Sequence, residues 1–165
     1  MSKDAEAYGI IKTAWPAIGT KENDGSYVMR VAYPPIENLS TGKVMGLVKI
    51  TYLTDKSCTE CYDVNNHKQI LTSPQSFAIM LDREETYDIS DATGKELLSK
   101  YNITQVPTVI LSEDVSVYPS SQAMKQFFSL EKDGSFVFRA LQAVGTYKDL
   151  IKNEVVKQQQ NQGSQ

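Results

Sequence analysis

The sequence has little of what several classes of protein need. Its 165 residues include 2 cysteines, 1 histidine and 1 tryptophan, and no apolar run reaches the length of a membrane span. Two cysteines are too few for a scaffold held together by disulfides, and one histidine restricts acid–base catalysis. A net charge of −3 gives no electrostatic reason to expect binding to nucleic acid or to an anionic membrane. With 41% hydrophobic residues, the chain has the composition and length of one globular domain.

The two cysteines lie close together at a predicted junction of two elements. Cys58 and Cys61 follow residues 44–53, whose β-branched and aromatic residues predict a buried strand. The residues from 58 to 71 lack glycine and proline and predict a helix. Unpaired N–H groups at a helix start would stabilise a thiolate at Cys58, and one helical turn would bring Cys61 within reach. This arrangement is typical of a redox site.

Further segments alternate between strand and helix patterns. Turn residues and apolar periodicity predict strands at 27–33, 77–81 with a continuation at 86–89, 107–111 and 136–139. Helices are predicted at 4–14, 91–101, from Ser120 or Ser121 through Phe128, and from the capping box at Thr146 to 155. The charged residues 82–85 are expected to form a solvated turn. The alternation predicts an α/β fold with a central mixed sheet flanked by helices and an N-terminal helix–strand appendage.

A short internal similarity bears on domain organisation. Residues 24–30 match residues 133–139 at an offset of 109, with five of seven positions identical. One interpretation is a tandem duplication, in which residues 8–35 end a preceding copy and residues 44–157 form the next. The other is two unrelated Asp-Gly hairpin turns, which are common. The expected organisation is an appendage at 1–43, a domain at 44–157 and a disordered or linker-like tail at 158–165.

The second half of the chain resembles the thioredoxin-like family. The run from Tyr101 to Leu111, YNITQVPTVIL, is similar to that family's Y-x-I-x-x-x-P-T signature, and Asp88 ends a predicted strand between it and the cysteine pair. The resemblance covers residues 44–157 and implies a thioredoxin-like fold. It also implies that Pro107 is a cis-proline that faces the cysteines.

The resemblance assigns roles to the site residues. Cys58 would be the nucleophilic thiol and Cys61 the resolving thiol, and the two would form a reversible disulfide. Val106, together with Pro107, would bind an extended substrate through its backbone. Sequence physics alone gives less, because the proline that follows only biases Val106 to an extended conformation.

Three departures from the family pattern affect this chemistry. Ser57 stands where thioredoxins carry tryptophan, Thr59-Glu60 replaces Gly-Pro, and Tyr52 occupies the position of a buried acid. The Glu60 carboxylate should raise the pKa of both thiols, whereas Lys56 and the helix dipole act in the opposite direction. We therefore hypothesise that the pair acts as a reductant or a persistent disulfide, and not as a strong oxidant.

The predicted function is thiol–disulfide exchange with protein partners, without a cofactor. Two alternatives stay open. The first is a non-catalytic thioredoxin-like binding module with a structural disulfide. The second is metal binding by the cysteine pair and His67, which is disfavoured because His67 would lie about 9 Å beyond Cys61 along a helix.

Partners and location follow from the same observations. We expect a protein dithiol or disulfide as substrate, no nucleic acid and no membrane insertion. Residues 1–43 are expected to pack against the sheet or to contact a neighbouring repeat or a second copy, because Ile11, Trp15 and Val31 cannot be buried within so short a segment. Residues 1–6 carry no apolar signal core. The cysteine pair and the tandem organisation nevertheless favour an extracytoplasmic domain of a longer secreted or membrane-anchored precursor.

Overall fold

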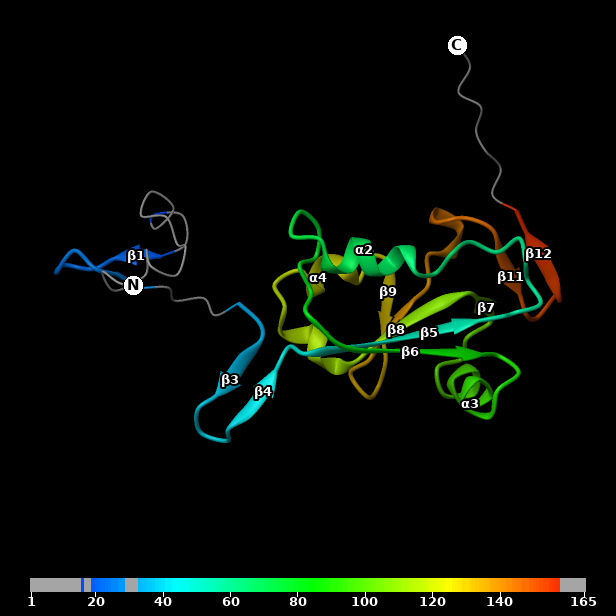
Figure 1. Ribbon diagram of the computed structural model, residues 1–165, viewed down its shortest axis with the longest axis horizontal. Coiled ribbons are helices and arrows are strands. Elements are labelled where there is room, and N and C mark those ends of the chain that lie inside the picture. Colours follow the sequence, from blue (N-terminus) through cyan, green and yellow to red (C-terminus); the bar gives the residue numbers. More distant parts are fainter. Residues whose placement is uncertain (1–15, 17–18, 29–32, 158–165) are drawn as a thin grey trace, which may run out of the picture. The chain divides into compact units, whose positions relative to one another are not determined.

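The computed structural model describes residues 16, 19–28 and 33–157, in two compact units that divide between Tyr33 and Pro34 (Figure 1). The predicted helix at 4–14, residues 29–32 of the predicted strand and the tail at 158–165 lie outside the described residues. The expected boundary lay at 43/44. Residues 34–43 instead belong to the larger unit.

The larger unit is built on a five-stranded mixed sheet with the order β6-β5-β8-β10-β9 (Figure 1). These strands are β5 (Val48–Thr54), β6 (Leu81–Asp88), β8 (Thr108–Leu111), β9 (Phe128–Leu130) and β10 (Phe136–Phe138). β5 and β6 are parallel, and β8 and β10 join them in antiparallel pairs. The central mixed sheet predicted from the sequence is thus confirmed.

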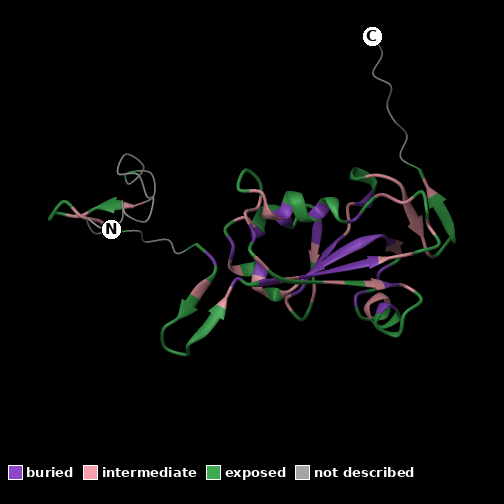
Figure 2. Ribbon diagram, viewed as in Figure 1, coloured by how far each residue is buried: buried purple, intermediate pink, exposed green. Residues whose placement is uncertain are grey.

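Side chains alternate across β5 and define two cores. Val48, Ile50 and Tyr52 belong to the larger core, to which α2 (Asn66–Thr72) contributes Leu71 and α4 (Ser121–Met124) contributes Met124. Leu53 on the opposite face belongs to a smaller core, beside leucines of α3 (Ala92–Lys100). Figure 2 shows the buried residues concentrated in the central strands. Helices therefore cover both faces of the sheet.

Several predicted elements are confirmed. α3 lies within the predicted 91–101 helix, and Asn102 ends it with a left-handed φ of 48°. β8 and β10 lie in their predicted segments, and the structure adds β9 and two short 3-10 helices, η3 (Glu113–Val117) and η4 (Leu141–Ala143). The helix predicted through Phe128 is shorter than expected, because α4 ends at Met124 and Phe128 begins β9.

The helix predicted at 58–71 begins only at Asn66. Backbone groups upstream of that residue are committed elsewhere: the Tyr62 N–H donates to the Thr146 carbonyl at 2.9 Å, and the Asn65 N–H donates to the Asp63 carboxylate at 2.9 Å. Such local side-chain bonds compete with helical hydrogen bonds. The prediction that Cys58 starts a helix was wrong.

The last predicted helix is also wrong, because residues 146–155 form a hairpin. Its strands are β11 (Tyr147–Asp149) and β12 (Glu154–Val156), and β11 also pairs with β7 (Gln105–Val106). The Asp149 carboxylate accepts the N–H groups of Ile151 and Lys152 at 3.0 Å, and Asn153 has a left-handed φ of 54°. The Asp149 side chain, which the capping box would place at a helix start, therefore stabilises the turn of a hairpin instead.

Two strand predictions change their limits. Residues 44–53 are split at Gly46, whose φ is +90°, into β5 and a strand β4 (Lys43–Met45) that pairs with β3 (Ile36–Asn38). The charged residues 82–85 do not form a turn, because they lie within the edge strand β6. Charges on an edge strand protect it from pairing with other chains.

The internal sequence similarity corresponds to two hairpins with the same geometry. In the smaller unit, β1 (Thr20–Lys21) pairs with β2 (Tyr27–Val28), and each pair matches one between β9 and β10 at the offset of 109. The turn glycines, Gly25 and Gly134, both have a φ of 84°, and in both turns an aspartate accepts the following serine N–H.

No described helix is long and apolar enough to cross a membrane.

Candidate functional site

The cysteine pair lies in a turn at the carboxyl end of β5. The Asp55 carboxylate accepts hydrogen bonds from the Ser57 N–H at 2.8 Å and the Ser57 hydroxyl at 2.6 Å. The Cys58 N–H then donates to the Asp55 carbonyl at 3.0 Å. Cys58 and Cys61 form a disulfide, and both residues are half-buried. The turn thus keeps both sulfurs near the molecular surface.

Asp88 holds this turn from the neighbouring strand. It is buried at the end of β6 and accepts the Lys56 N–H at 2.6 Å and the Ser90 hydroxyl at 2.5 Å. The hydrogen bond from the Ser90 hydroxyl lowers the pKa of the Asp88 carboxyl. The acidic residue that the sequence places at this strand end is therefore an anchor for the start of the cysteine turn.

A second anchor is an ion pair that sequence reasoning missed. The Lys148 ammonium lies 2.6 Å from the Asp55 carboxylate, and only 18% and 6% of these side chains are exposed. Burial by itself would raise the pKa of Asp55, but the hydrogen bonds from Lys148 and Ser57 outweigh it and keep that pKa below its ordinary value. The pair ties β11 to the residue that begins the cysteine turn.

The segment around Pro107 faces the cysteines. The Val106–Pro107 peptide bond is cis, as the family resemblance implied, and the Val106 carbonyl oxygen lies 3.9 Å from the Cys61 sulfur. The Tyr62 hydroxyl donates to the Pro107 carbonyl at 3.1 Å. Two segments that are far apart in the sequence are thereby joined into one site.

The backbone edge at Val106 is already paired with β11. Lys148 lies opposite Val106 in the antiparallel register, and the Leu150 N–H donates to the Thr104 carbonyl at 2.8 Å. Alternate pairs in an antiparallel ladder exchange both hydrogen bonds, so the Val106–Lys148 pair is of the hydrogen-bonded kind. An extended substrate could pair with this edge only after β11 had moved.

His67 lies behind the cysteine turn as a neutral, buried side chain. Its Nε2 atom is 3.1 Å from the Tyr62 hydroxyl, and its ring contacts the edge of Phe138 at 4.5 Å between centroids. With the Tyr62 proton donated to the Pro107 carbonyl, the matching tautomer of His67 carries its proton on Nε2 and donates it to Tyr62. Burial lowers the pKa of His67 to about 4.

Within the part of the chain that the structure describes, no group of three or more His, Cys, Asp or Glu residues could hold a metal ion.

The two residues expected to tune the thiol pKa lie at the rim. The Glu60 carboxylate forms an exposed ion pair with Lys157 at 2.8 Å, which weakens its effect on the cysteines. Lys56 contributes its N–H to the turn, and its side chain is exposed. Since α2 begins at Asn66, no helix start contributes to the stabilisation of a Cys58 thiolate.

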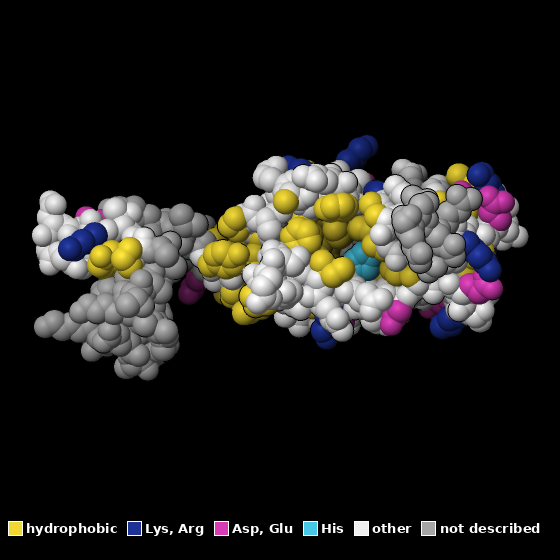
Figure 3. Space-filling view, turned by 90° about the horizontal axis from the view of Figure 1, so that it is seen from above, with side chains coloured by type: hydrophobic (Ala, Val, Ile, Leu, Met, Phe, Trp, Pro, Cys, Tyr) yellow, Lys and Arg dark blue, Asp and Glu magenta, His cyan; other side chains and the backbone are white. Residues whose placement is uncertain are grey.

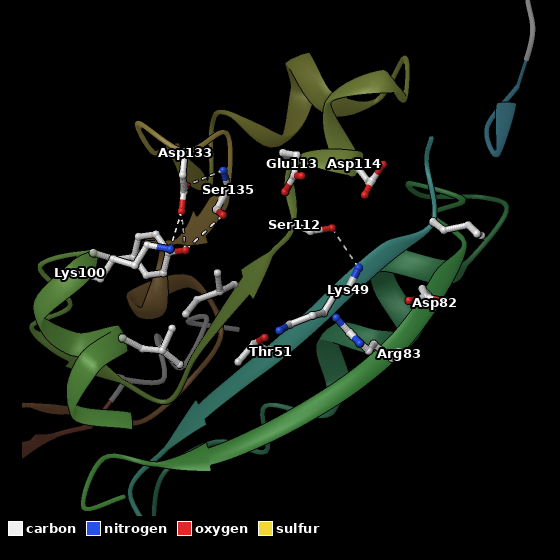
Figure 4. A pocket seen from close by; sticks show the side chains of 14 residues that line it. Lys49, Thr51, Asp82, Arg83, Lys100, Ser112, Glu113, Asp114, Asp133 and Ser135 are labelled. Carbon is white, nitrogen blue, oxygen red and sulfur yellow. Dashed lines mark hydrogen bonds and ion pairs between the residues drawn. The ribbon is translucent and has the colours of Figure 1, made fainter. Parts of the chain in front are cut away.

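Several hollows lie outside the cysteine site, and two of them differ in size and polarity. The larger, about 590 Å³, lies on the sheet face that α3 covers only in part, and Figure 4 shows Lys49, Thr51 and Arg83 along its floor. A smaller apolar hollow of about 230 Å³ is lined by His67 and by side chains such as Ile70 and Phe127. Figure 3 shows hydrophobic side chains gathered around the histidine. Neither hollow is lined by a cysteine.

Tyr62, Asp55 and Lys148 are the site residues that the sequence analysis did not identify. Tyr62 directly follows the cysteine pair, which was a usable signal, whereas nothing near Lys148 points to the site. Comparison with protein-family models, curated proteins and solved structures finds no match to this chain.

Proposed function

We propose that residues 48–156 form a thioredoxin-like unit that catalyses thiol–disulfide exchange through Cys58 and Cys61. The observation that carries this proposal is the juxtaposition of the disulfide with the Val106–Pro107 segment, 3.9 Å from the Cys61 sulfur. The strand order and directions support it, because two parallel strands, β5 and β6, are followed by two antiparallel strands, β8 and β10. The partner is a protein that carries an accessible disulfide or dithiol.

Exchange starts from the reduced pair when the Cys58 thiolate attacks a sulfur of the partner disulfide. A mixed disulfide forms between Cys58 and the partner, the partner's own disulfide breaks, and its second sulfur leaves as a thiolate that takes a proton from water. The Cys61 thiolate then attacks the Cys58 sulfur, which re-forms the Cys58–Cys61 disulfide and releases the partner as a dithiol. Two electrons pass from the protein to its partner.

The surroundings favour the oxidised form of the pair. A Cys58 thiolate lacks the stabilisation that a helix start would give, and the nearest ionised group to Cys61 in sequence is the Glu60 carboxylate. Because a poorly stabilised thiolate makes reduction less favourable, the pair fits the role of a reductant or of a persistent disulfide.

A trapping experiment on the full chain tests the catalytic assignment. The variant Cys61→Ser is reduced, mixed with oxidised glutathione at pH 7.5 and analysed by intact mass; Cys58→Ser is the matched control. We expect a glutathione adduct that forms several times faster on Cys61→Ser than on Cys58→Ser. Equal rates, or faster reaction in Cys58→Ser, would contradict the assignment of Cys58 as the nucleophile.

The occupied edge at Val106 favours a second candidate, a thioredoxin-like binding module with a structural disulfide. In that case the pair would have a reduction potential below about −300 mV, whereas a working oxidoreductase would lie at about −270 to −200 mV. Equilibration with dithiol buffers, followed by alkylation and mass measurement, separates the two functions.

A further inference from the structure

The larger unit contains two hairpins of the same form, β3–β4 and β11–β12, and their sequences share almost no residues. β3 pairs with β4 in the register Ile36↔Met45, and β11 pairs with β12 in the register Tyr147↔Val156. Every cross-strand pair of the first hairpin maps onto a pair of the second at an offset of 111. Only Leu39/Leu150 and Val44/Val155 are identical in the compared stretch.

The two turns also share their internal hydrogen bonds. The Asn38 side-chain oxygen accepts the N–H groups of residues 40 and 41 at 3.0 and 3.2 Å, and Asp149 does the same for residues 151 and 152. Gly42 and Asn153, at equivalent places, both have a left-handed φ, of 68° and 54°. Together with the β1–β2 and β9–β10 match, two successive hairpins near the start of the chain reproduce two successive hairpins near its end.

The copies differ in what lies beyond their first strand. β11 pairs on its outer edge with β7, and Leu150 packs against the smaller core. Among the described residues, no strand pairs with the outer edge of β3. Leu39, the equivalent of Leu150, is 92% exposed. A leucine that is half-buried against a core in one copy and almost fully exposed in the other indicates a missing partner.

The β3–β4 hairpin is joined to the rest of the larger unit through a hydrogen-bonded residue. Gly46 connects it to β5, its N–H donates to the Asp114 carboxylate at 3.0 Å, and its carbonyl accepts the Tyr118 hydroxyl at 2.6 Å. A Cβ built at Gly46 would lie 2.5 Å from the Pro34 side chain, so this close approach needs glycine. The connection between the hairpin and β5 therefore has a defined conformation at Gly46.

The charge at one position indicates that a strand pairing with the outer edge of β3 would differ from β7 of this unit in its surroundings. β11 carries Lys148 next to the buried Asp55, whereas β3 carries Glu37 at the equivalent place. Glu37 beside Asp55 would bring two carboxylates together in a site with little solvent, which is unfavourable.

We propose that the outer edge of β3 is a docking strand for a neighbouring copy of this repeat, and that it pairs with the strand before that copy's equivalent of Pro107. The neighbour's core covers Leu39, and a cationic side chain replaces Asp55 opposite Glu37. Pairing of a strand with a sheet edge is an established mode of recognition between domains. The hairpin thus closes one unit and leads into the next.

A graft into the full chain tests this docking without a separate partner. Residues 147–156 are replaced by the sequence of residues 36–45, with and without Asp55→Lys. The matched control is the graft with Asp55→Lys in which the transplanted segment also carries the substitution Leu39→Asp. In the grafted chain this aspartate stands at position 150. Position 150 stays leucine in the first two chains, so hydrogen exchange of its amide, which bonds to Thr104 in the native chain, reports docking in each.

With Asp55→Lys, we expect the position-150 amide to keep its protection to within about tenfold of the native chain. The graft alone should lose at least about tenfold and the Leu39→Asp control at least about a hundredfold. Amides of β5 provide the check that the rest of the unit remains folded.

Protection of the position-150 amide no better than in the control, with or without folding of β5, would overturn the docking. Equal protection with and without Asp55→Lys would overturn the role of Glu37. Because the cysteine pair is unchanged in every variant, the result does not depend on the proposed redox activity.

Discussion

Lys148 lies opposite Val106 in the β7–β11 ladder, and its ammonium forms the part-buried ion pair with Asp55 at the start of the cysteine turn. One residue therefore holds together the two segments that make up the site. Its backbone occupies the edge at Val106, where the proposed substrate strand would have to pair, and its side chain fixes the turn that carries the disulfide.

Lys148→Met should destabilise the protein by about 3 kcal/mol, because it leaves the Asp55 carboxylate buried without its cation while retaining most of the apolar stem. Urea unfolding at pH 7 measures this change. The control is Lys152→Met, which removes an exposed ion pair with Glu154 and should cost less than about 0.5 kcal/mol. Equal effects of the two substitutions would show that the Lys148 pair adds nothing specific.

Tyr62→Phe should cost about 1–3 kcal/mol, because it removes the donor to the Pro107 carbonyl and the acceptor for His67 in one step. The same substitution should speed reduction of the disulfide by a dithiol, since the two halves of the site are held less firmly. The control is Tyr87→Phe, which breaks a hydrogen bond to Glu85 on the edge strand β6. If both variants unfold at the same urea concentration, the bridge from Tyr62 is not a structural link.

The sequence predicted the parts of this fold that depend on local, strongly periodic patterns. The buried strand through Tyr52, the α3 helix and the Asp-Gly turn before Phe136 are all present. The sequence also indicated the neighbourhood of the cysteines, because the Cys58–Cys61 disulfide lies beside the carbonyl of Val106, whereas the roles of these residues stay predictions. The sequence motifs around the cysteines and Pro107, however, do not indicate which strand pairs with Val106, because that pairing is with β11, far along the chain.

The failures have a common physical cause in long-range pairing. The capping-box pattern at Thr146 is real, but pairing of Lys148 with Val106 and the turn formed by Asp149 stabilise a strand instead. The Tyr62 N–H is likewise bonded to Thr146, which prevents the helix from starting at the cysteines. Asp149 and Asn153, of residue types that favour turns and left-handed conformations, were the local signals of a hairpin.

His67 should make stability fall as the pH is lowered. Its pKa is about 4 in the folded protein and about 6.5 when unfolded, so the unfolded chain binds a proton first. The contribution is fully present above pH 6.5 and decreases between pH 6.5 and 4, by up to about 3 kcal/mol in total. Urea unfolding of the native chain and of His67→Gln from pH 8 to 4.5 measures the difference. Parallel curves for the two proteins would show that His67 does not titrate in this way.

Glu60→Gln should make the disulfide easier to reduce, because it removes a carboxylate that disfavours the thiolates on either side. The Glu60 side chain is 57% exposed and paired with Lys157, so the rise in reduction potential should be small, on the order of 10 mV. Equilibration with dithiol buffers at low ionic strength measures it, and 1 M salt should abolish it through screening. Glu154→Gln is the control for a general change in net charge. An unchanged potential in Glu60→Gln, or an equal shift in the control, would remove Glu60 from the account of why the oxidised pair is favoured.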